Sequence, residues 1–253
     1  MSQPQPAGGP LPLLYHRPEV LDAARHARLG LRPQTDWSFA AAANAVPLTL
    51  SEFARAAVSF PIVFAVGRQS LSPVAVTGLR GGQNLFVRPD GAWEPDAHVP
   101  AYLRRVPFIL TRPDDGTDEV LLCLDLDSPR VAPDVTAEDA APLFADGAPT
   151  DHARRAMDFC LDYQRHAMAT DTVVAALREA GVLARREGKV DLAGGETLTL
   201  TDFEVVDEAA LNALPPERFL ALREAGALPA AWCQMISMQC WGRLTRLAEA
   251  RRG

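Results

Sequence analysis

Short apolar runs alternate with turn-forming residues through residues 62–131, whereas most of the chain beyond residue 150 repeats its apolar positions at helical spacing. In the first region each run has the length and composition of a β-strand, and Gly, Pro, Asp and Asn fill the gaps. Strands joined by such tight turns pair antiparallel. The pattern therefore predicts an antiparallel sheet made of Ile62–Val66, Val74–Leu79, Leu85–Val87, Phe108–Thr111 and Val120–Asp125.

The turns of this sheet are rich in glycine and proline. Residues 80–84 are predicted to join two strands as a hairpin, residues 89–91 to form a second turn, and residues 113–116 to form the next hairpin loop. The segment GLRGGQN lacks the lysine of a phosphate-binding loop. Its glycines are instead explained by turn positions that require a positive φ.

Helical spacing is clearest beyond Thr150. Thr150 or Asp151 is predicted to cap a long helix that runs to about Leu183, with Gly181 as its natural stop. Residues 16–33 fit a short helix or an irregular arm. The other predicted elements are a helix from Thr49 or Ser51 through Ala57, a helical turn or two at 101–106, hairpin strands at Lys189–Leu192 and Thr197–Phe203, and helices at 207–212, 215–225 and 229–251.

Together these elements predict an α+β fold. An amino-terminal antiparallel sheet lobe, residues 13–131, is expected to pack with a mainly helical carboxy-terminal lobe, residues 151–253, that contains a small β-hairpin. The two lobes are expected to share a core within one domain, residues 13–253. Residues 1–12 form an expected mobile tail, because their Pro, Gly and Gln bury too little apolar area to offset the entropy of ordering.

Composition and charge narrow the function classes. The 253 residues are 48% hydrophobic and 23% charged, which is typical of a globular protein, and no apolar run approaches the roughly 18 residues that a membrane helix needs. A formal net charge of −7 disfavours nucleic-acid binding, which depends on clustered basic residues. Because the amino-terminal segment lacks the features of a secretory signal, we expect a cytoplasmic protein without membrane insertion.

Cysteine and histidine spacing indicates neither a metal nor a cofactor. The four cysteines lack CxxC spacing and are expected to be small buried residues without a disulfide or zinc. The five histidines show no HxH or HExxH pattern, and the chain has no GxSxG elbow. We therefore expect no catalytic set and no cofactor.

Several unusual segments follow one another in a fixed order along the chain. They are DWSFAAAANAVPLTLSEF, SFPIVF, PVAVTGL, GGQNLFV, GAWEPDAHVPAYLRRVPF, LLCLDLDSP and FEVVDEAALNALP. Their order resembles the SapC family, named from a protein associated with bacterial surface-layer genes. The resemblance covers roughly residues 12–247 and implies an accessory role in the biogenesis of surface-layer or outer-surface proteins, with no established catalytic residue to transfer.

Aromatic and arginine residues gather between residues 93 and 105. Side chains of these types combine large apolar area with guanidinium groups that bind carboxylates through paired hydrogen bonds. We predict that Trp93, Tyr102, Arg104 and Arg105, together with Asn84, bind a peptide or protein partner. In the alternative interpretation, Trp93 and Tyr102 pack against the sheet while one arginine forms an internal ion pair.

Asp125 and Asp127 end the apolar strand of LLCLDLDSP and point to one side, because strand residues alternate between faces. Two carboxylates there could bind Mg²⁺, and the segment resembles the DxDxT motif of haloacid-dehalogenase-like phosphatases, although Pro129 replaces the threonine. The structural alternative is an Asp-Ser-Pro turn whose carboxylates accept backbone N–H groups or pair with Arg104 or Arg105.

The sequence leaves two interpretations open for each of two further features. Glu52 is either a general base or a carboxylate that interacts with the first turn of its helix. Near the carboxy terminus, a helical stripe either packs in the core or fills the groove of a partner. The stripe contains Trp232, Met235 or Ile236, Gln239 or Cys240, and Leu244.

These observations favour a non-enzymatic accessory or binding protein of the SapC type that recognises a peptide or protein. The alternative is a Mg²⁺-dependent hydrolase or transferase that uses Asp125 and Asp127. The sequence leaves the identity of the partner and the oligomeric state open.

Overall fold

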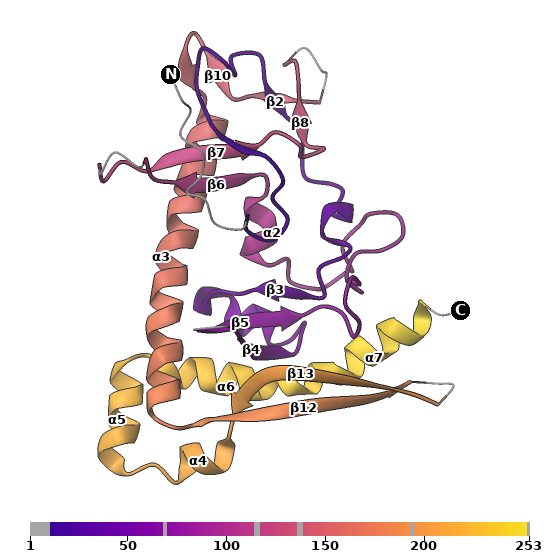
Figure 1. Cartoon of the computed structure of the whole chain (residues 1–253), viewed down its shortest axis with the longest axis vertical. Coiled ribbons are helices and arrows are strands. Elements are labelled where there is room, and N and C mark those ends of the chain that lie inside the picture. Colours follow the sequence, from indigo (N-terminus) through magenta and orange to yellow (C-terminus); the bar gives the residue numbers. More distant parts are fainter. Residues whose placement is uncertain (1–10, 68–69, 114–116, 136–138, 193–194, 252–253) are drawn as a thin grey trace. The chain divides into compact units, whose positions relative to one another are not determined.

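A computed structural model describes residues 11–67, 70–113, 117–135, 139–192 and 195–251. It contains antiparallel sheets and a helical region towards the carboxy terminus, which confirms the predicted α+β class (Figure 1). The predicted mobile tail, residues 1–12, lies almost wholly outside the described residues, as does most of the predicted loop 113–116. No described helix is both long and apolar enough to cross a membrane.

The chain folds into two compact units, and each unit combines two stretches of sequence. The small unit comprises Met1–Thr35 and Arg104–Gln164, and the large unit comprises Asp36–Leu103 and Arg165–Gly253. These boundaries differ from the predicted sub-lobes, 13–131 and 151–253, because long-range pairing joins segments from both halves of the sequence. A single domain over residues 13–253 stays a prediction.

The large unit contains a five-stranded antiparallel sheet in the order β12-β13-β4-β5-β3. The bounds of β4 are those predicted, whereas β5 begins three residues before the predicted Val74. The carboxy-terminal hairpin is longer than predicted and projects as a ribbon in Figure 1. The strands are β3 (Ala45–Pro47), β4 (Ile62–Val66), β5 (Leu71–Val76), β12 (Leu183–Leu192) and β13 (Glu196–Val206).

Helices of the large unit come from both ends of its sequence. Residues of its core also come from both ends, including the fully buried Phe60 and Phe64 and the equally buried Leu211 and Leu244. The helices are the 3₁₀ turns Ser38–Ala40 and Leu50–Glu52, the latter followed directly by α1 (Phe53–Ala56), then α4 (Glu208–Asn212), α5 (Pro216–Glu224), α6 (Ala227–Ser237), the 3₁₀ turn Met238–Cys240 and α7 (Trp241–Ala250).

Buried polar side chains attach α6 to the sheet. The amide of Gln234 accepts the N–H of Val206 at 3.0 Å and donates to the carbonyl of Ile62 at 3.0 Å. The hydroxyl of Ser237 accepts the N–H of Ile62 at 2.9 Å. Gln234 and Ser237 are fully buried, so these bonds satisfy backbone groups that would otherwise lose water without a partner.

The predicted continuous helix 229–251 is wrong in one respect, because a 3₁₀ turn separates α6 from α7. That turn changes the helical phase and splits the predicted stripe. Cys240 and Leu244 are buried, as core packing predicts, whereas Trp232 is 41% exposed and Ile236 is 51% exposed.

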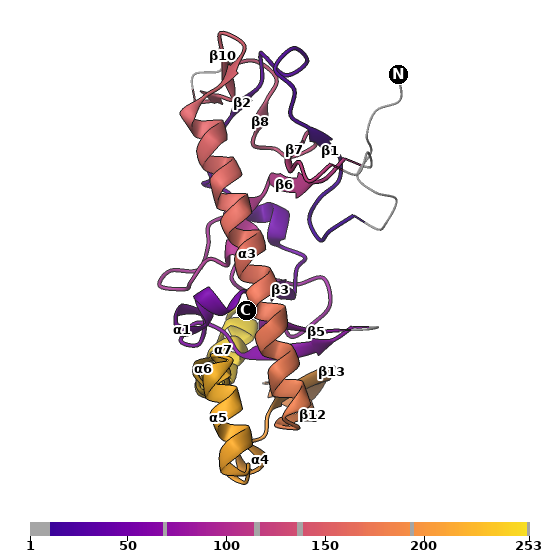
Figure 2. The same cartoon turned by 90° about the vertical axis from the view of Figure 1, so that its left-hand side faces the viewer.

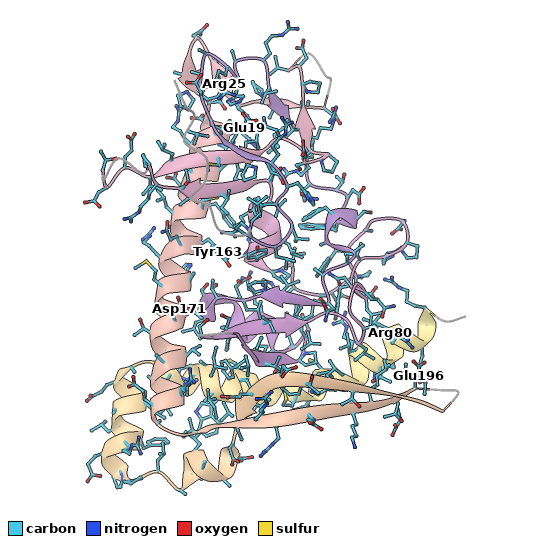
Figure 3. All side chains as sticks on the ribbon, viewed as in Figure 1. Glu19, Arg25, Arg80, Tyr163, Asp171 and Glu196 are labelled. Atoms are coloured by element: carbon cyan, nitrogen blue, oxygen red, sulfur yellow. The ribbon has the colours of Figure 1, made fainter. Side chains whose placement is uncertain are left out.

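The predicted strand Leu85–Val87 is wrong: these residues are buried, but their only pairing is an isolated bridge between Val87 and Trp93. The preceding loop closes through the N–H of Leu85, which donates to the carbonyl of Thr77 at 2.7 Å. Arg80 fastens this loop to β13 by donating to both carboxylate oxygens of Glu196 at 2.6 Å (Figure 3).

The glycines of this loop have different structural roles. Gly82 has a φ of +76°, as predicted. Gly78 instead allows a close backbone approach, because a Cβ atom there would overlap the carbonyl group of Gln83. We expect Gly78→Ala to lower the free energy of unfolding by about 2 kcal/mol, the usual cost of overpacking.

Gly81→Ala is the matched control for this prediction, since a Cβ atom at Gly81 meets nothing within 4 Å. Its expected effect stays within about 0.5 kcal/mol. Urea denaturation followed by circular dichroism measures both changes. Equal stabilities for the two variants would contradict the close approach at Gly78.

The small unit contains the three-stranded antiparallel sheet β1-β7-β6, in which β6 has the predicted bounds. The predicted arm at residues 16–33 is not helical: it contains β1, which pairs with β7, and β2, which pairs with β8 and β9. The strands are β1 (Pro18–Val20), β2 (Gly30–Leu31), β6 (Phe108–Thr111), β7 (Leu121–Asp125), β8 (Val131–Ala132), β9 (Ala141–Pro142), β10 (Phe144–Ala145) and β11 (Ala148–Pro149).

Two helices contribute to the small unit. The predicted turn between Pro100 and Pro107 is α2 (Ala101–Arg105), and the long predicted helix is α3 (Asp151–Glu179), seen along its length in Figure 2. Gly181, with a φ of +69°, follows the end of α3 as predicted. Residues of α3 pack against a separate apolar core of this unit, which includes Phe108, Leu124, Leu143, Ala153 and Cys160.

Candidate anion-binding pocket

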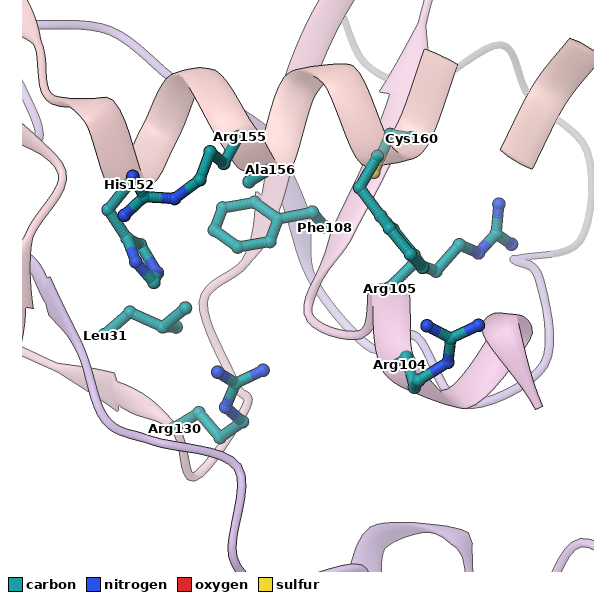
Figure 4. Close-up of a pocket in the computed structure, with 10 residues that line it drawn as sticks. Leu31, Arg104, Arg105, Phe108, Arg130, His152, Arg155, Ala156 and Cys160 are labelled. Carbon is teal, nitrogen blue, oxygen red and sulfur yellow. The ribbon is translucent and has the colours of Figure 1, made fainter. Parts of the chain in front are cut away.

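A pocket lined by arginine residues lies in the small unit (Figure 4). Its volume is about 180 Å³, and none of the ten described residues that line it is acidic. This charge pattern contrasts with the net charge of −7 of the whole chain. The cationic lining residues are Arg104, Arg105, Arg130 and Arg155, and the largest apolar ones are Leu31, Phe108 and Phe159.

The first three turns of α3 form one wall of this pocket. Five lining residues share one face of α3, because residues three or four positions apart on a helix are neighbours on its surface. They are His152, Arg155, Ala156, Phe159 and Cys160. On this face the cationic side chain of Arg155 lies among apolar ones. Helical periodicity therefore places a guanidinium group beside an aromatic ring.

Arg130 is anchored by backbone carbonyl groups rather than by a carboxylate. Its Nε donates to the carbonyl of Arg32 at 3.1 Å, and its Nη1 donates to the carbonyl of Val106 at 2.8 Å. Burial lowers the pKa of Arg130 to about 10, so the group remains protonated at neutral pH. Within the described residues no carboxylate forms an ion pair with it. Arg130 therefore places a rigid, uncompensated positive charge in the pocket.

Arg155 and His152 also indicate a positive electrostatic potential in the pocket. The exposed guanidinium of Arg155 makes no hydrogen bond or ion pair with another residue in the described part of the chain. Burial lowers the pKa of His152 below its ordinary 6.5, and the charges of Arg130 and Arg155 lower it further. His152 is accordingly neutral at pH 7, because a proton there would face two positive charges.

Aromatic rings orient the other two arginines. The guanidinium carbon of Arg104 lies 5.2 Å from the ring centre of Phe159. That of Arg105 lies 4.4 Å from the ring of Tyr163, which is labelled in Figure 3, and 5.5 Å from the ring of Tyr15. Such stacking restricts the orientation of the two guanidinium groups.

The predicted binding residues divide between the two units. Arg104 and Arg105 lie together in the pocket, whereas Trp93, Tyr102 and Asn84 belong to the large unit and do not line it. Tyr102 is only 5% exposed. A role in binding stays a prediction for these three residues.

Trp93 and Asn84 have identifiable structural contacts. Trp93 stacks on Phe86 at 5.9 Å and meets Trp37 edge to face at 5.8 Å, which agrees with the packing alternative. The side chain of Asn84 accepts the N–H of Phe86 at 2.9 Å and donates to the carbonyl of Ala40 at 3.1 Å. Both the oxygen and the nitrogen of its buried amide therefore form hydrogen bonds with the backbone of nearby loops.

The two predicted carboxylates at the end of β7 lie in different environments. Asp125 is 1% exposed, and its carboxylate accepts the backbone N–H groups of His16 at 2.9 Å and Arg17 at 2.8 Å. Asp127 is exposed and pairs with the side chain of Arg17 at 2.9 Å. Asp125 thus fastens the amino-terminal arm to β7, in agreement with the structural alternative, although the partners are not the arginines named from the sequence.

The buried carboxylate of Glu52, in the large unit, accepts several hydrogen bonds. It completes a capping box with Thr49, as a first-turn carboxylate does, and also accepts from the N–H of Ala101 at 2.6 Å and from Nε2 of His98 at 2.9 Å. Burial alone would raise the pKa of Glu52, but hydrogen bonds from His98, Ala101 and Thr49 outweigh burial and lower it. The carboxylate is therefore ionised and acts as a structural acceptor.

Among the arginine and histidine residues of the pocket, sequence reasoning missed Arg130, His152 and Arg155. The spacing of His152 and Arg155 on a helix is a usable signal, because residues three apart share a face. Arg130 carries no local signal. Its place depends on the carbonyl groups of residues 98 and 24 positions away along the chain.

A model of the SapC family matches residues 21–244, nearly the whole chain. No curated protein and no solved structure matches the chain.

Proposed function

Because this chain belongs to the SapC family, as its resemblance predicted, we propose that it is a non-enzymatic accessory protein whose arginine pocket binds a peptide or protein partner. The observation that carries the proposal is a pocket of four arginines without an acidic lining residue. Guanidinium groups bind carboxylates through charge-assisted hydrogen bonds, often two at once. A partner that carries a carboxylate matches this lining.

The chemistry of the lining favours binding over catalysis. Arginine does not exchange its proton near neutral pH and so does not serve as a general acid or base. Burial raises the pKa of the Cys160 thiol to about 11, which leaves it protonated and a poor nucleophile. His152 is the only lining residue whose ordinary pKa lies near neutrality.

The biological setting of this proposal follows the family. The partner is a protein bound for the surface layer or outer surface, and the chain holds it in the cytoplasm before export. Cation–π stacking supports the binding role, since the fixed orientation of Arg104 and Arg105 reduces the entropy lost when a partner binds.

Capture of partners from a lysate of the native host tests this function. The bait is the full chain with a tag, compared with the double variant Arg104→Ala, Arg155→Gln, and captured proteins are quantified by mass spectrometry. We expect at least one protein to be retained about tenfold less by the double variant, because two charged hydrogen-bond donors of the pocket are lost.

The matched control replaces two arginines outside the pocket, Arg154→Gln with Arg25→Gln, and removes the same charge. It is expected to retain the partner. Equal capture by wild type and by both double variants would refute the pocket as the binding site. A melting curve for each bait confirms that the variants are folded.

A further inference from the structure

We infer that the arginine pocket binds the carboxyl-terminal residue of its partner, with the terminal carboxylate on the guanidinium groups and an apolar last side chain against the aromatic wall. This inference rests on the proposed function, namely binding of a peptide or protein at this pocket. It adds which part of the partner enters and which chemistry that part has.

Uncompensated charge is the first reason. Arg130 is part-buried, held only by carbonyl groups, and forms no ion pair within the described residues. Arg155 lines the same pocket from an exposed position and makes no ion pair within the described residues, although its charge acts on the nearby carboxylate of Asp151. A part-buried charge without a counter-ion is costly, and an anion that accepts its remaining N–H groups removes much of that cost.

The apolar lining is the second reason, because it selects among anions. Leu31 and Phe108 line the same pocket as the guanidinium groups (Figure 4). Phe159 lines it as well. A free phosphate would bind the guanidinium groups and leave this apolar surface exposed to water. In an internal Asp or Glu the side chain itself ends in the carboxylate, so the same Cα atom bears no separate apolar side chain. A terminal residue bears a carboxylate and an apolar side chain on one Cα atom, so it satisfies both parts of the lining.

Size is the third reason. The pocket has a volume of about 180 Å³. This space suits one amino-acid residue. A chain that ends in the pocket fills it with that residue, whereas a chain that continues must also accommodate main chain leaving on a second side.

The test uses four short peptides and the purified full chain. The probes are N-acetyl-Gly-Gly-Leu with a free carboxyl terminus, the same peptide as its amide, N-acetyl-Gly-Gly-Gly with a free terminus, and the internal-acid peptide N-acetyl-Gly-Asp-Gly-amide. Inorganic phosphate is the fifth ligand. Affinity is measured by calorimetry, and the imidazole signals of His152 are followed by NMR through a pH titration.

The leucine free acid is expected to bind at least tenfold more tightly than each of the other three peptides and than phosphate. The amide loses the charged contact, and the glycine peptide loses apolar burial. The bound free acid is also expected to raise the pKa of His152, because its carboxylate offsets the charges of Arg130 and Arg155. Arg155→Gln should weaken binding about fivefold, and Arg154→Gln, its exposed neighbour, should not.

The remaining outcomes separate this inference from the proposed function. Equal binding of the internal-acid peptide and the leucine acid, both weakened by Arg155→Gln, would overturn the preference for a chain end and leave the carboxylate-binding function intact. Tighter binding of phosphate, with the largest shift of His152, would overturn the inference in favour of a phosphate-bearing ligand. No binding of any probe, with lysate capture unaffected by the pocket variants, would refute both.

Discussion

Replacing Glu52 by glutamine is expected to lower the free energy of unfolding by about 4 kcal/mol, the largest effect that we expect from a single isosteric substitution in this chain. Glu52 is 5% exposed. One carboxylate oxygen accepts from His98 and Ala101, and the other accepts from the N–H and the hydroxyl of Thr49. Glutamine keeps one acceptor oxygen and places an NH₂ group where the second stood, so two buried donors lose their acceptor.

The Glu52 effect should depend on pH with a definite sign. The pKa of Glu52 in the folded chain lies below its ordinary value of 4.5. A carboxyl group whose pKa is lowered by folding contributes stability that is fully present above the unfolded pKa and is lost as the pH falls through the folded pKa. The stability difference between wild type and Glu52→Gln should therefore be constant from pH 7 down to about 5 and shrink below 4.5.

Glu224→Gln is the control for Glu52. Glu224 is exposed at the end of α5, so its replacement should change stability by less than about 0.5 kcal/mol at every pH. Urea denaturation between pH 3.5 and 7 measures both variants. A difference at Glu52 that stays constant to pH 3.5, or a cost no larger than that at Glu224, would contradict the structural role.

Asp125→Asn is expected to lower the free energy of unfolding by about 3 kcal/mol, since hydrogen bonds to charged groups contribute about 1.5–3 kcal/mol each. The buried carboxylate accepts from the N–H groups of His16 and Arg17 through separate oxygens. Asparagine has one acceptor oxygen, so one of these donors would face an NH₂ group. The substitution should increase the hydrogen-exchange rates of the His16 and Arg17 amides, measured by NMR, by a larger factor than the rates of other amides in the small unit.

Asp127→Asn is the matched control, because it removes an equal charge two residues away. Its ion pair with Arg17 is half exposed, so the expected cost is less than about 1 kcal/mol. The same pair of variants tests the Mg²⁺-dependent hydrolase alternative, in which both aspartates act as ligands. Calorimetric binding of Mg²⁺ by wild type that is lost in both variants would favour the enzyme and contradict a purely structural Asp125.

Local sequence patterns predicted the elements whose formation depends on neighbouring residues. The strand Ile62–Val66 and the strand Phe108–Thr111 have the predicted bounds, and Gly181 follows the long helix as expected. Leu85–Val87 was predicted as a strand because an apolar run after a glycine turn has the same pattern whether or not a partner strand pairs with it. Strand pairing is a long-range property.

The candidate pocket was predictable in part. Arg104 and Arg105 stand out because they lie on a short helix between two prolines, next to aromatic residues. Arg130, His152 and Arg155 were not identified, since no short segment indicates that they face the same cavity. Asp125 was recognised as a carboxylate in a turn, but its donors lie 108 and 109 residues earlier in the chain.

The amino-acid sequence by itself determined the α+β class, the SapC family and most helix and strand positions, because hydrophobic period, proline and glycine act over a few residues. Only the tertiary structure decided which charges meet. It joined Met1–Thr35 to Arg104–Gln164 in one unit and left Arg130 with carbonyl partners. The reason is physical: electrostatic and hydrogen-bond partners are set by distance in space, and that distance depends on how the whole chain packs.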